Sequence, residues 1–469
     1  MTDLVIVVLY LVVTLAVGIF VGRNVKSMKD FSVSAKIFPT SVLISTIFAT
    51  WMGADCLIGV SERVYSVGLV YFVVILGVSL NFFFQAYVVA PKIIRGFSNR
   101  ISIGEIMGDL YGNPGQVMSG VANILFSVGC ISMQVRAIGF ICNQFFGVSE
   151  FYGIIIGGGI IVAYSSFGGI RSVVFTDVLQ FGVLIIGIPL MASVALGKVG
   201  GWEYLMNSLP SKYTELTSYE GSFWSFIAYF SWCAFPSFLP ALVQRILMAK
   251  DERQATRSLA ISGILCIPFF AVVSVIALCA ILIFPGIDSN SAFLNVLDYS
   301  LPTIVKGIAI SGMLSAFMST ADSLLNAASI AATRDVFAVL WPTKVNDKRE
   351  LMLSRTVTVL LGVASIYVAT MFYSMVEFGL FFSNFWTPAV VAPMFLYLFN
   401  LKTDIKTYLI GVSIGFISII IFRYSVPENC TVVSQIFGAL VTFVTMFVLG
   451  RYWKTLSHPC DPDLVVSRI

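Results

Sequence analysis

The chain has 469 residues, of which 58% are hydrophobic and only 11% are charged, and its formal net charge is +4. A soluble domain of this length does not need so much apolar surface, so the composition excludes an ordinary soluble protein and indicates the lipid bilayer as a partner. The small positive charge gives no reason to expect nucleic acid as a partner.

Long apolar segments follow one another through the chain. A helix needs about 20 apolar residues to cross a bilayer, whereas strands of a membrane barrel have about ten residues with alternating polarity. The sequence therefore predicts an all-α membrane protein with about thirteen transmembrane helices. They lie near 2–22, 41–60, 66–91, 117–146, 150–168, 172–197, 221–247, 257–285, 302–333, 351–374, 377–400, 405–424 and 433–452. The first lacks a basic leader and a cleavage site, so we expect it to be retained.

Basic residues in the loops predict the orientation. With this segmentation, roughly 22 of the 28 Lys and Arg fall on one side, which the positive-inside rule makes cytoplasmic. The N-terminus is then outside, and a short tail, 453–469, is inside. No polar linker divides the chain, so we expect one transporter domain over 1–469, functional as a monomer in the plasma (inner) membrane.

Two segments carry helix-breaking residues at mid-membrane. The segment 41–60 contains Gly53, Ala54 and Asp55, which predict unwound backbone near Ala49–Asp55 because Gly lowers helicity and Asp is costly in lipid. Pro236 and Pro240 interrupt 221–247 at a similar depth. Paired interrupted helices are typical of inverted-repeat transporters with a midplane site. We predict five-helix repeats at about 41–197 and 221–400, with discontinuous first and sixth core helices, and extra helices at 2–22, 405–424 and 433–452.

Two arginines lie in or at the end of apolar segments. Arg136 is deep in 117–146, where a buried charge is a functional candidate and a salt bridge, perhaps to Asp55, is the structural alternative. Arg245 ends the segment 221–247 and is predicted to be an interfacial anchor.

Oxygen-bearing residues indicate an ion site. Ala316, Ser319 and Thr320 share one helical face, because residues three and four apart are neighbours. Unwound backbone would add the carbonyls of Ala49 and Met52, and five neutral oxygens suit a dehydrated Na⁺ as coupling ion. The alternative is that both hydroxyls simply bond to carbonyls one turn earlier in their own helix.

Three other polar residues lie near this face. Asp177 and Gln180 can bind a second ion, but the favoured interpretation is that Asp177 organises a loop beside Arg171. Asp322 lies off the face of Ser319, so we expect it to tune the local field or to pair with a base. We assign Arg136, Asp177, Gln180 and Asp322 structural or coupling roles.

Three motifs resemble the sodium:solute symporter family, which includes sodium-coupled sugar, proline, pantothenate, iodide and choline transporters. They are Phe167–Gln180 (FGGIRSVVFTDVLQ), Gln244-Arg245, and Ser319–Ser323 (STADS) followed by Thr333-Arg334-Asp335. The resemblance implies a core of five plus five helices. It also implies a sodium site that maps onto Ala49, Met52, Ala316, Ser319 and Thr320.

Aromatic and polar residues near both breaks predict a substrate cavity. They are Trp51, Asp55, Tyr229, Trp232, Ser237, Phe382 and Asn384. Aromatic rings suit an apolar ring or a quaternary ammonium, though each ring can equally serve packing or face lipid. The stretch around Trp51 is most similar to the choline branch, but Leu239 and Cys130 stand where that branch has aromatics. The proline branch is the close alternative and carries Asp where this chain has Trp51.

The predicted function is Na⁺-driven symport of a small organic solute, either proline or another amino acid, or a choline-like amine. Alternatives are a proton-coupled or facilitative carrier of the same fold, a channel, and a membrane sensor without transport. The sequence has no phosphate loop or nucleophile elbow, so we do not expect an enzyme. Its one histidine, and eight cysteines without a CxxC or Cys/His cluster, disfavour a proton relay and a soft-metal site.

Overall fold

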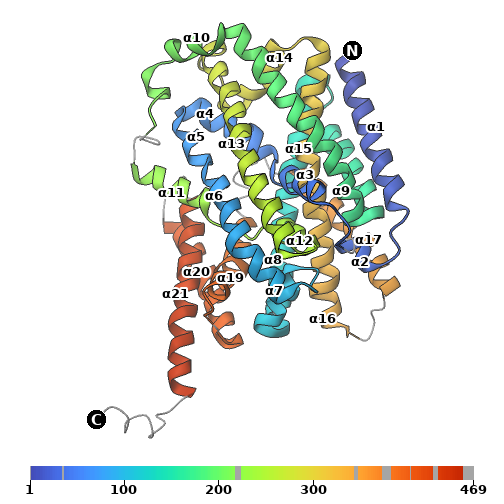
Figure 1. Cartoon of the computed structure of the whole chain (residues 1–469), viewed down its shortest axis with the longest axis vertical. Coiled ribbons are helices and arrows are strands. Elements are labelled where there is room, and N and C mark those ends of the chain that lie inside the picture. Colours follow the sequence, from blue (N-terminus) through green and yellow to red (C-terminus); the bar gives the residue numbers. More distant parts are fainter. Residues whose placement is uncertain are drawn as a thin grey trace.

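The computed structural model describes residues 2–33, 36–216, 223–342, 347–371, 382–401, 403–425 and 431–457, and its regular elements in these ranges are helices (Figure 1). The first half contains α1 (Thr2–Gly22), α2 (Met28–Ser32), α3 (Thr40–Trp51), η2 (Asp55–Gly59), α4 (Val60–Val67), α5 (Val70–Ile75), α6 (Gly77–Phe84), η3 (Gln85–Val89), α7 (Ala90–Phe97), α8 (Ile103–Phe146), α9 (Glu150–Val199), α10 (Gly201–Ser208) and η4 (Ser211–Tyr213). The second half contains α11 (Phe223–Ala234), α12 (Pro240–Met248), α13 (Glu252–Ile283), η5 (Ser289–Ser291), α14 (Ala292–Ser300), α15 (Thr303–Ile330), η6 (Ala331–Phe337), α16 (Ala338–Leu340), α17 (Asp347–Met371), η8 (Thr387–Val391), α19 (Ala392–Leu398), α20 (Ile405–Ser425) and α21 (Thr431–Ser457).

Among these residues, nine helical stretches are long and apolar enough to cross a membrane, or ten if one bent pair counts as a span. The predicted thirteen are not confirmed. The helix α9 joins the predicted segments 150–168 and 172–197, but 50 residues would measure about 75 Å, so its kink at Gly169 is where one crossing gives way to the next. The segment 221–247 forms the two short helices α11 and α12. Part of 377–400, and the tail from 458 onward with His458, lie outside the described residues.

Both predicted breaks are present. The helix α3 ends at Trp51, residues 52–54 are not helical, and the chain bends by 67° into η2 and α4. The unwound stretch is shorter than predicted, because Ala49 is still helical and Asp55 already begins η2. Between α11 and α12 the chain leaves the helix around Pro236, which cannot donate a backbone hydrogen bond. The repeat symmetry stays a prediction.

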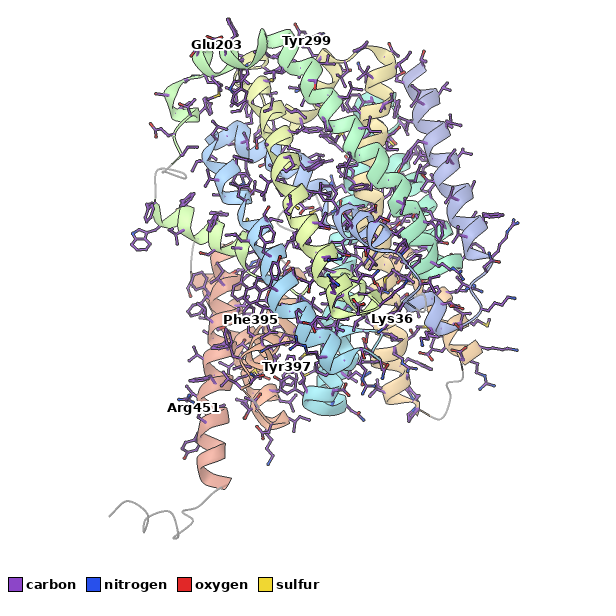
Figure 2. The ribbon with its side chains drawn as sticks, in the orientation of Figure 1. Lys36, Glu203, Tyr299, Phe395, Tyr397 and Arg451 are labelled. Carbon is purple, nitrogen blue, oxygen red and sulfur yellow. The ribbon has the colours of Figure 1, made fainter. Side chains whose placement is uncertain are left out.

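The helix α15 lies at the centre of the bundle. It packs against α8, α9, α1 and α3, and 78% of the apolar stretch that includes it is buried. Figure 1 shows α1 at one edge of the molecule and α21 at the opposite edge. The start of α1 and the end of α21 lie at opposite ends of the bundle, which agrees with an odd number of crossings. In Figure 2, Glu203 and Tyr299 are at one end, while Lys36 and Arg451 lie toward the other.

The kink in α9 depends on a glycine pair that the motif FGGIR contributes. Gly169 has φ +51°, and a Cβ there would lie 2.4 Å from the Phe31 ring. We therefore expect Gly169→Ala to destabilise the protein by about 1–3 kcal/mol, because both the backbone and the space oppose a side chain. Thermal unfolding of the detergent-solubilised protein measures this. Gly182→Ala, on the same helix with nothing within 4 Å of its Cβ, is the control and should leave the midpoint unchanged or higher. Equal midpoints for both variants would contradict the expectation.

Candidate functional site

The break after α3 releases two backbone carbonyls. In a continuous helix, the carbonyls of Ala49 and Met52 would accept the N–H groups of residues 53 and 56. Instead the Gly53 N–H donates to the Trp51 carbonyl at 3.0 Å, and the Cys56 N–H donates to the Gly53 carbonyl at 3.1 Å. Ala49 and Met52 are both buried. Their oxygens are therefore buried acceptors without their usual helical donors, which is the condition under which backbone can bind a cation.

The helix α15 brings hydroxyl groups to this break. The Thr320 hydroxyl donates to the Thr50 carbonyl at 3.0 Å and also approaches the Ala316 carbonyl one turn earlier at 3.2 Å. The Ser319 hydroxyl donates to the Asp177 carboxylate. Because each hydroxyl hydrogen is used toward another oxygen, the hydroxyl lone pairs remain available as acceptors. The structure thus links the broken helix α3 to the residue face that the sequence predicted.

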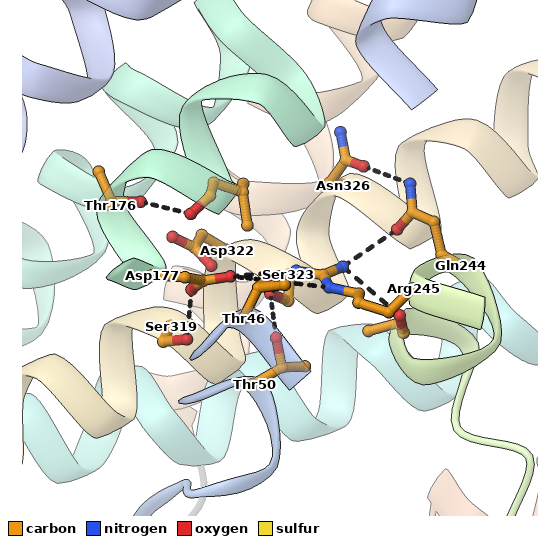
Figure 3. A network of polar contacts seen from close by, with 12 residues as sticks. Thr46, Thr50, Thr176, Asp177, Gln244, Arg245, Ser319, Asp322, Ser323 and Asn326 are labelled. Atoms are coloured by element: carbon orange, nitrogen blue, oxygen red, sulfur yellow. Dashed lines mark hydrogen bonds and ion pairs between the residues drawn. The ribbon is translucent and has the colours of Figure 1, made fainter. Parts of the chain in front are cut away.

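A buried ion pair lies next to Ser319 (Figure 3). The Arg245 guanidinium from α12 is 3.4 Å from an Asp177 carboxylate oxygen on α9, and both side chains are completely buried. Arg245 also donates to the hydroxyl of Ser323 at 2.5 Å and to that of Thr46 at 3.3 Å. Thr46 donates in turn to Asp177. The pair therefore joins α3, α9, α12 and α15 through side chains alone.

This arrangement corrects two predictions. Arg245 is not an interfacial anchor, since it has no exposed surface and is the largest completely buried side chain in the described part of the chain. Asp177 does not organise a loop beside Arg171, because its ion-pair partner is Arg245, 68 positions later. The signal was available in the sequence as two opposite charges inside apolar segments, each costly alone and tolerable as a pair.

Further polar residues extend the network, and the sequence analysis gave none of them a role in the site. The Gln244 amide donates to the Asn326 side chain at 2.8 Å and to the Ser32 carbonyl at 2.5 Å. The hydroxyls of Thr50 and Ser323 are 2.9 Å apart. Only their spacing along α15 and α12 could have indicated them, and many buried Ser and Thr residues have the same spacing without such a role.

Asp322 on α15 lies near Asp177 in the same network (Figure 3). One of its carboxylate oxygens accepts a hydrogen bond from the Tyr164 hydroxyl at 2.5 Å, while the other has no hydrogen-bond partner among the described residues. Its hydrogen-bond partner is thus a phenol and not a base, and the alternative role, tuning the local field, stays a prediction. Both amide atoms of buried Gln180 also lack partners.

Trp51 and Asp55 flank the unwound backbone. The Trp51 ring packs edge-on against the Phe82 ring, with 5.1 Å between the ring centroids, and Trp51 is half-buried. Asp55 is exposed, although it begins η2 in the middle of a broken span. The amide oxygen of Gln134 accepts the Ala54 N–H at 2.8 Å and so fixes the start of the second half-helix. Trp51 at the end of α3 and Asp55 at the start of η2 thus lie on either side of the break.

The predicted substrate residues around the second break are only partly collected there. The Tyr229 ring lies under the Arg63 guanidinium at 5.9 Å, and Trp232 is half-buried on the same helix, α11. The carbonyl of Ser237 accepts the Trp386 indole N–H at 2.8 Å, which ties the break to the end of the helical stretch 382–386. The hydroxyl of Ser237 is buried without a partner.

The remaining predicted residues lie on α8 and its neighbours. Phe382 covers Gly129 of α8, where an added Cβ would lie 2.5 Å from the ring. Asn384 is buried and its amide oxygen lacks a partner. The sequence analysis suggested a salt bridge between Arg136 and Asp55, but Arg136 pairs with another carboxylate. Its guanidinium is 3.1 Å from Glu150, at the start of α9, and donates to the Ala369 carbonyl at 3.1 Å.

The sodium:solute symporter family model matches residues 38–415. The chain is 22% identical to the sodium/proline symporter of Staphylococcus aureus (strain JH9) over 382 residues, which cover 77% of this chain and 74% of that protein. A solved Na⁺-coupled sialic acid symporter, in a substrate-bound outward-open state, has a TM-score of 0.83 at 17% identity and 96% coverage of both chains. A nucleobase-cation-symport-1 family transporter, in a closed conformation with bromovinylhydantoin bound, has a TM-score of 0.60 at 13% identity. The match covers 92% of this chain and 95% of that chain.

The helical fold with its interrupted spans is that of a multi-pass membrane protein, and the symporter family model that matches it makes it a transporter and not an enzyme. Because the family model covers well over half of its residues, the chain belongs to the sodium:solute symporter family.

Proposed function

We propose that this protein is a secondary active symporter that couples inward Na⁺ movement to uptake of a small organic solute. The observation that carries the proposal is the pair of carbonyls released at the break in α3, opposite the hydroxyls of α15. The proposed ion ligands are the carbonyls of Ala49, Met52 and Ala316 with the hydroxyls of Ser319 and Thr320. All five residues are buried and none of them titrates, so the set favours a metal ion over a proton.

In this proposal, Na⁺ couples the two helices that form its site. An ion between α3 and α15 replaces contacts that the broken helix lacks, and thereby favours the conformation in which the solute cavity is complete. Solute and ion each raise the other's affinity, because both favour the same state. One charge that crosses 100 mV supplies about 2.3 kcal/mol, which supports roughly a fifty-fold gradient of a neutral solute.

The ion-pair network acts as the closed cytoplasmic half of this cycle. With the predicted orientation, α3 runs outward from the cytoplasm, so Thr46 and Arg245 lie on the cytoplasmic side of the break. Their contacts with Asp177 and Ser323 hold four helices together there. Asp55 begins η2 beyond the break, and therefore on the outer side of it in this orientation. The structure thus fits an outward-facing state.

The proposed substrate carries a cationic nitrogen. The exposed carboxylate of Asp55 attracts a positive charge, and the neighbouring indole of Trp51 supplies cation–π attraction. Both an amino acid such as proline and a quaternary amine such as choline meet this requirement. The similarity to sodium/proline symporters supports proline as the first solute to test.

Uptake into proteoliposomes tests the proposal. We expect an inward Na⁺ gradient to drive accumulation of radiolabelled proline or choline, and Asp55→Asn to raise the KM for that solute at least tenfold. Asp298→Asn, which removes an exposed carboxylate on α14, is the control and should transport normally.

The rival functions give different results in the same assay. Uptake that follows a proton gradient, or that is equal with and without Na⁺, would replace the symporter by a proton-coupled or facilitative carrier. A sensor would bind solute without accumulating it, whichever gradient is imposed.

A further inference from the structure

A groove of about 690 Å³ opens on the surface between η3 and α13, and shares no residue with the polar network. One end is charged and the other apolar. Arg253 and Arg257, both exposed, lie at the charged end, and Tyr87, Ile261 and Ile264 lie along the rest. The rise of α13 from Arg253 to Ile264 is about 16 Å, close to the thickness of one hydrocarbon leaflet. The groove therefore has the length and the polarity gradient of a phospholipid.

The charged end has an excess of positive charge. Glu252 also lines the groove, but its carboxylate accepts hydrogen bonds from Nε and Nη2 of Arg95, at 2.8 and 2.5 Å, and its charge is neutralised. Neither Arg253 nor Arg257 forms an ion pair within the part of the chain that the structure describes. The two side chains are four residues apart on one helix, so their guanidinium groups lie on one face and repel each other without an anion.

The position of these arginines on α13 strengthens the attraction for an anion. Arg253 lies in the first turn of a 32-residue helix. The N-terminal end of a helix carries a partial positive charge, so a cation there is unfavourable and an anion is favourable. The side chain of Arg253 is thus destabilised at this position unless a negatively charged group lies next to it.

The apolar end of the groove is also exposed. A soluble anion would not contact this apolar surface. Tyr87 is 64% exposed and Ile264 is 54% exposed. Exposed apolar surface beside a basic cluster is typical of a helix that passes from the membrane interface into the hydrocarbon region. The loop charges predict that Lys250, Arg253 and Arg257 are cytoplasmic, so the lipid would belong to the inner leaflet.

We propose that this groove is a binding site for one anionic phospholipid of the cytoplasmic leaflet. The two arginines and the end of α13 bind its phosphate, and Ile261 and Ile264 contact one acyl chain. The occupant is a lipid and not a free phosphate, because a free anion leaves the apolar length of the groove uncovered.

Native mass spectrometry of the purified full-length protein tests this. We expect detergent-solubilised protein to retain phosphatidylglycerol at least tenfold more strongly than phosphatidylcholine. Arg253→Gln/Arg257→Gln should weaken phosphatidylglycerol binding at least fivefold. The control, Lys26→Gln/Lys29→Gln, removes the same charge from exposed residues elsewhere on the predicted cytoplasmic side and should bind normally. All four side chains are exposed, so we expect these variants to fold.

Two further measurements separate lipid from soluble anion and from general surface charge. Ile264→Trp should fill the groove and weaken phosphatidylglycerol binding without any change in charge. Inorganic phosphate should compete only weakly. Phosphate that displaces the lipid at low millimolar concentration, equal loss in the lysine control, or equal affinity for phosphatidylcholine would each overturn the proposal. Because the readout is lipid retention, it does not depend on whether the protein transports Na⁺.

Discussion

Protein that carries Ser319→Ala and Thr320→Ala loses Na⁺-dependent uptake at physiological Na⁺ concentration. The change removes two of the five proposed ligands while the backbone carbonyls remain. A hydrogen bond to a charged group contributes about 1.5–3 kcal/mol, and we take a hydroxyl ligand to Na⁺ to be worth at least as much. Two such losses raise the half-saturating Na⁺ concentration by about 100-fold or more. Uptake measured against Na⁺ concentration at fixed membrane potential gives this value directly.

A binding readout makes the result independent of the substrate. Na⁺ that binds only the folded state raises the unfolding midpoint, by an amount that grows with the ratio of the Na⁺ concentration to its Kd. K⁺ does not raise it. We expect the wild type to show this Na⁺-specific shift and the double variant to lose it. Ser319 also contacts Asp177, so the absolute midpoint of the variant will fall, and only the difference between Na⁺ and K⁺ is informative.

The matched control is Ser315→Ala. Ser315 is buried on the same helix, and its hydroxyl donates to the Ser311 carbonyl one turn earlier at 2.7 Å. Its hydroxyl is not among the five proposed ligands and is bonded within its own helix, so this variant should keep both the Na⁺ shift and the uptake. A double variant that still shows wild-type Na⁺ dependence would exclude the five-oxygen site.

The shared face of the proposed ion ligands on α15 could be predicted from the sequence because helical spacing alone determines which residues share a face. Ser319 and Thr320 lie three and four residues after Ala316, and one helical turn brings all three together. Likewise, Gly53, Pro236 and Pro240 indicated the breaks through local backbone preference, which needs no tertiary information.

What could not be predicted depends on which helices meet. Asp177 and Arg245 are 68 positions apart, and their pairing requires α9 and α12 to meet at α3 and α15. Nothing local in either segment specifies that distance, so Arg245 was assigned to the membrane interface, where an unpaired arginine costs least. A salt bridge was among the alternatives for Arg136, but its partner Glu150 could not be named for the same reason, since the packing of α8 against α9 brings the two together.

Removing one partner of the Asp177–Arg245 pair destabilises the protein by about 3–5 kcal/mol, because the other charge stays buried without compensation. We expect Arg245→Met and Asp177→Asn each to lower the unfolding midpoint and the yield of folded protein. The double variant Asp177→Asn/Arg245→Met removes both charges together and should recover more than half of the lost stability. Thermal unfolding of all four proteins forms a double-mutant cycle that gives the coupling between the two residues.

An exposed ion pair provides the comparison for that cycle. Arg95 and Glu252 make a bidentate pair at 2.8 and 2.5 Å, but their side chains are 70% and 37% exposed. Solvent screens such a pair strongly, so Arg95→Gln and Glu252→Gln should have small effects on the unfolding midpoint with little coupling. If the buried pair couples no more strongly than the exposed one, then it does not hold the four helices together.

Transport by the rescued double variant separates stability from function. Arg245 contacts Thr46 on α3 and Ser323 on α15, besides Asp177 on α9, and methionine can make none of these hydrogen bonds. A folded protein without them loses the contacts that close the proposed cytoplasmic half. We therefore expect the double variant to bind Na⁺ but to accumulate solute poorly, with faster efflux from preloaded proteoliposomes. Wild-type accumulation by this variant would mean that the pair serves folding alone and has no part in the transport cycle.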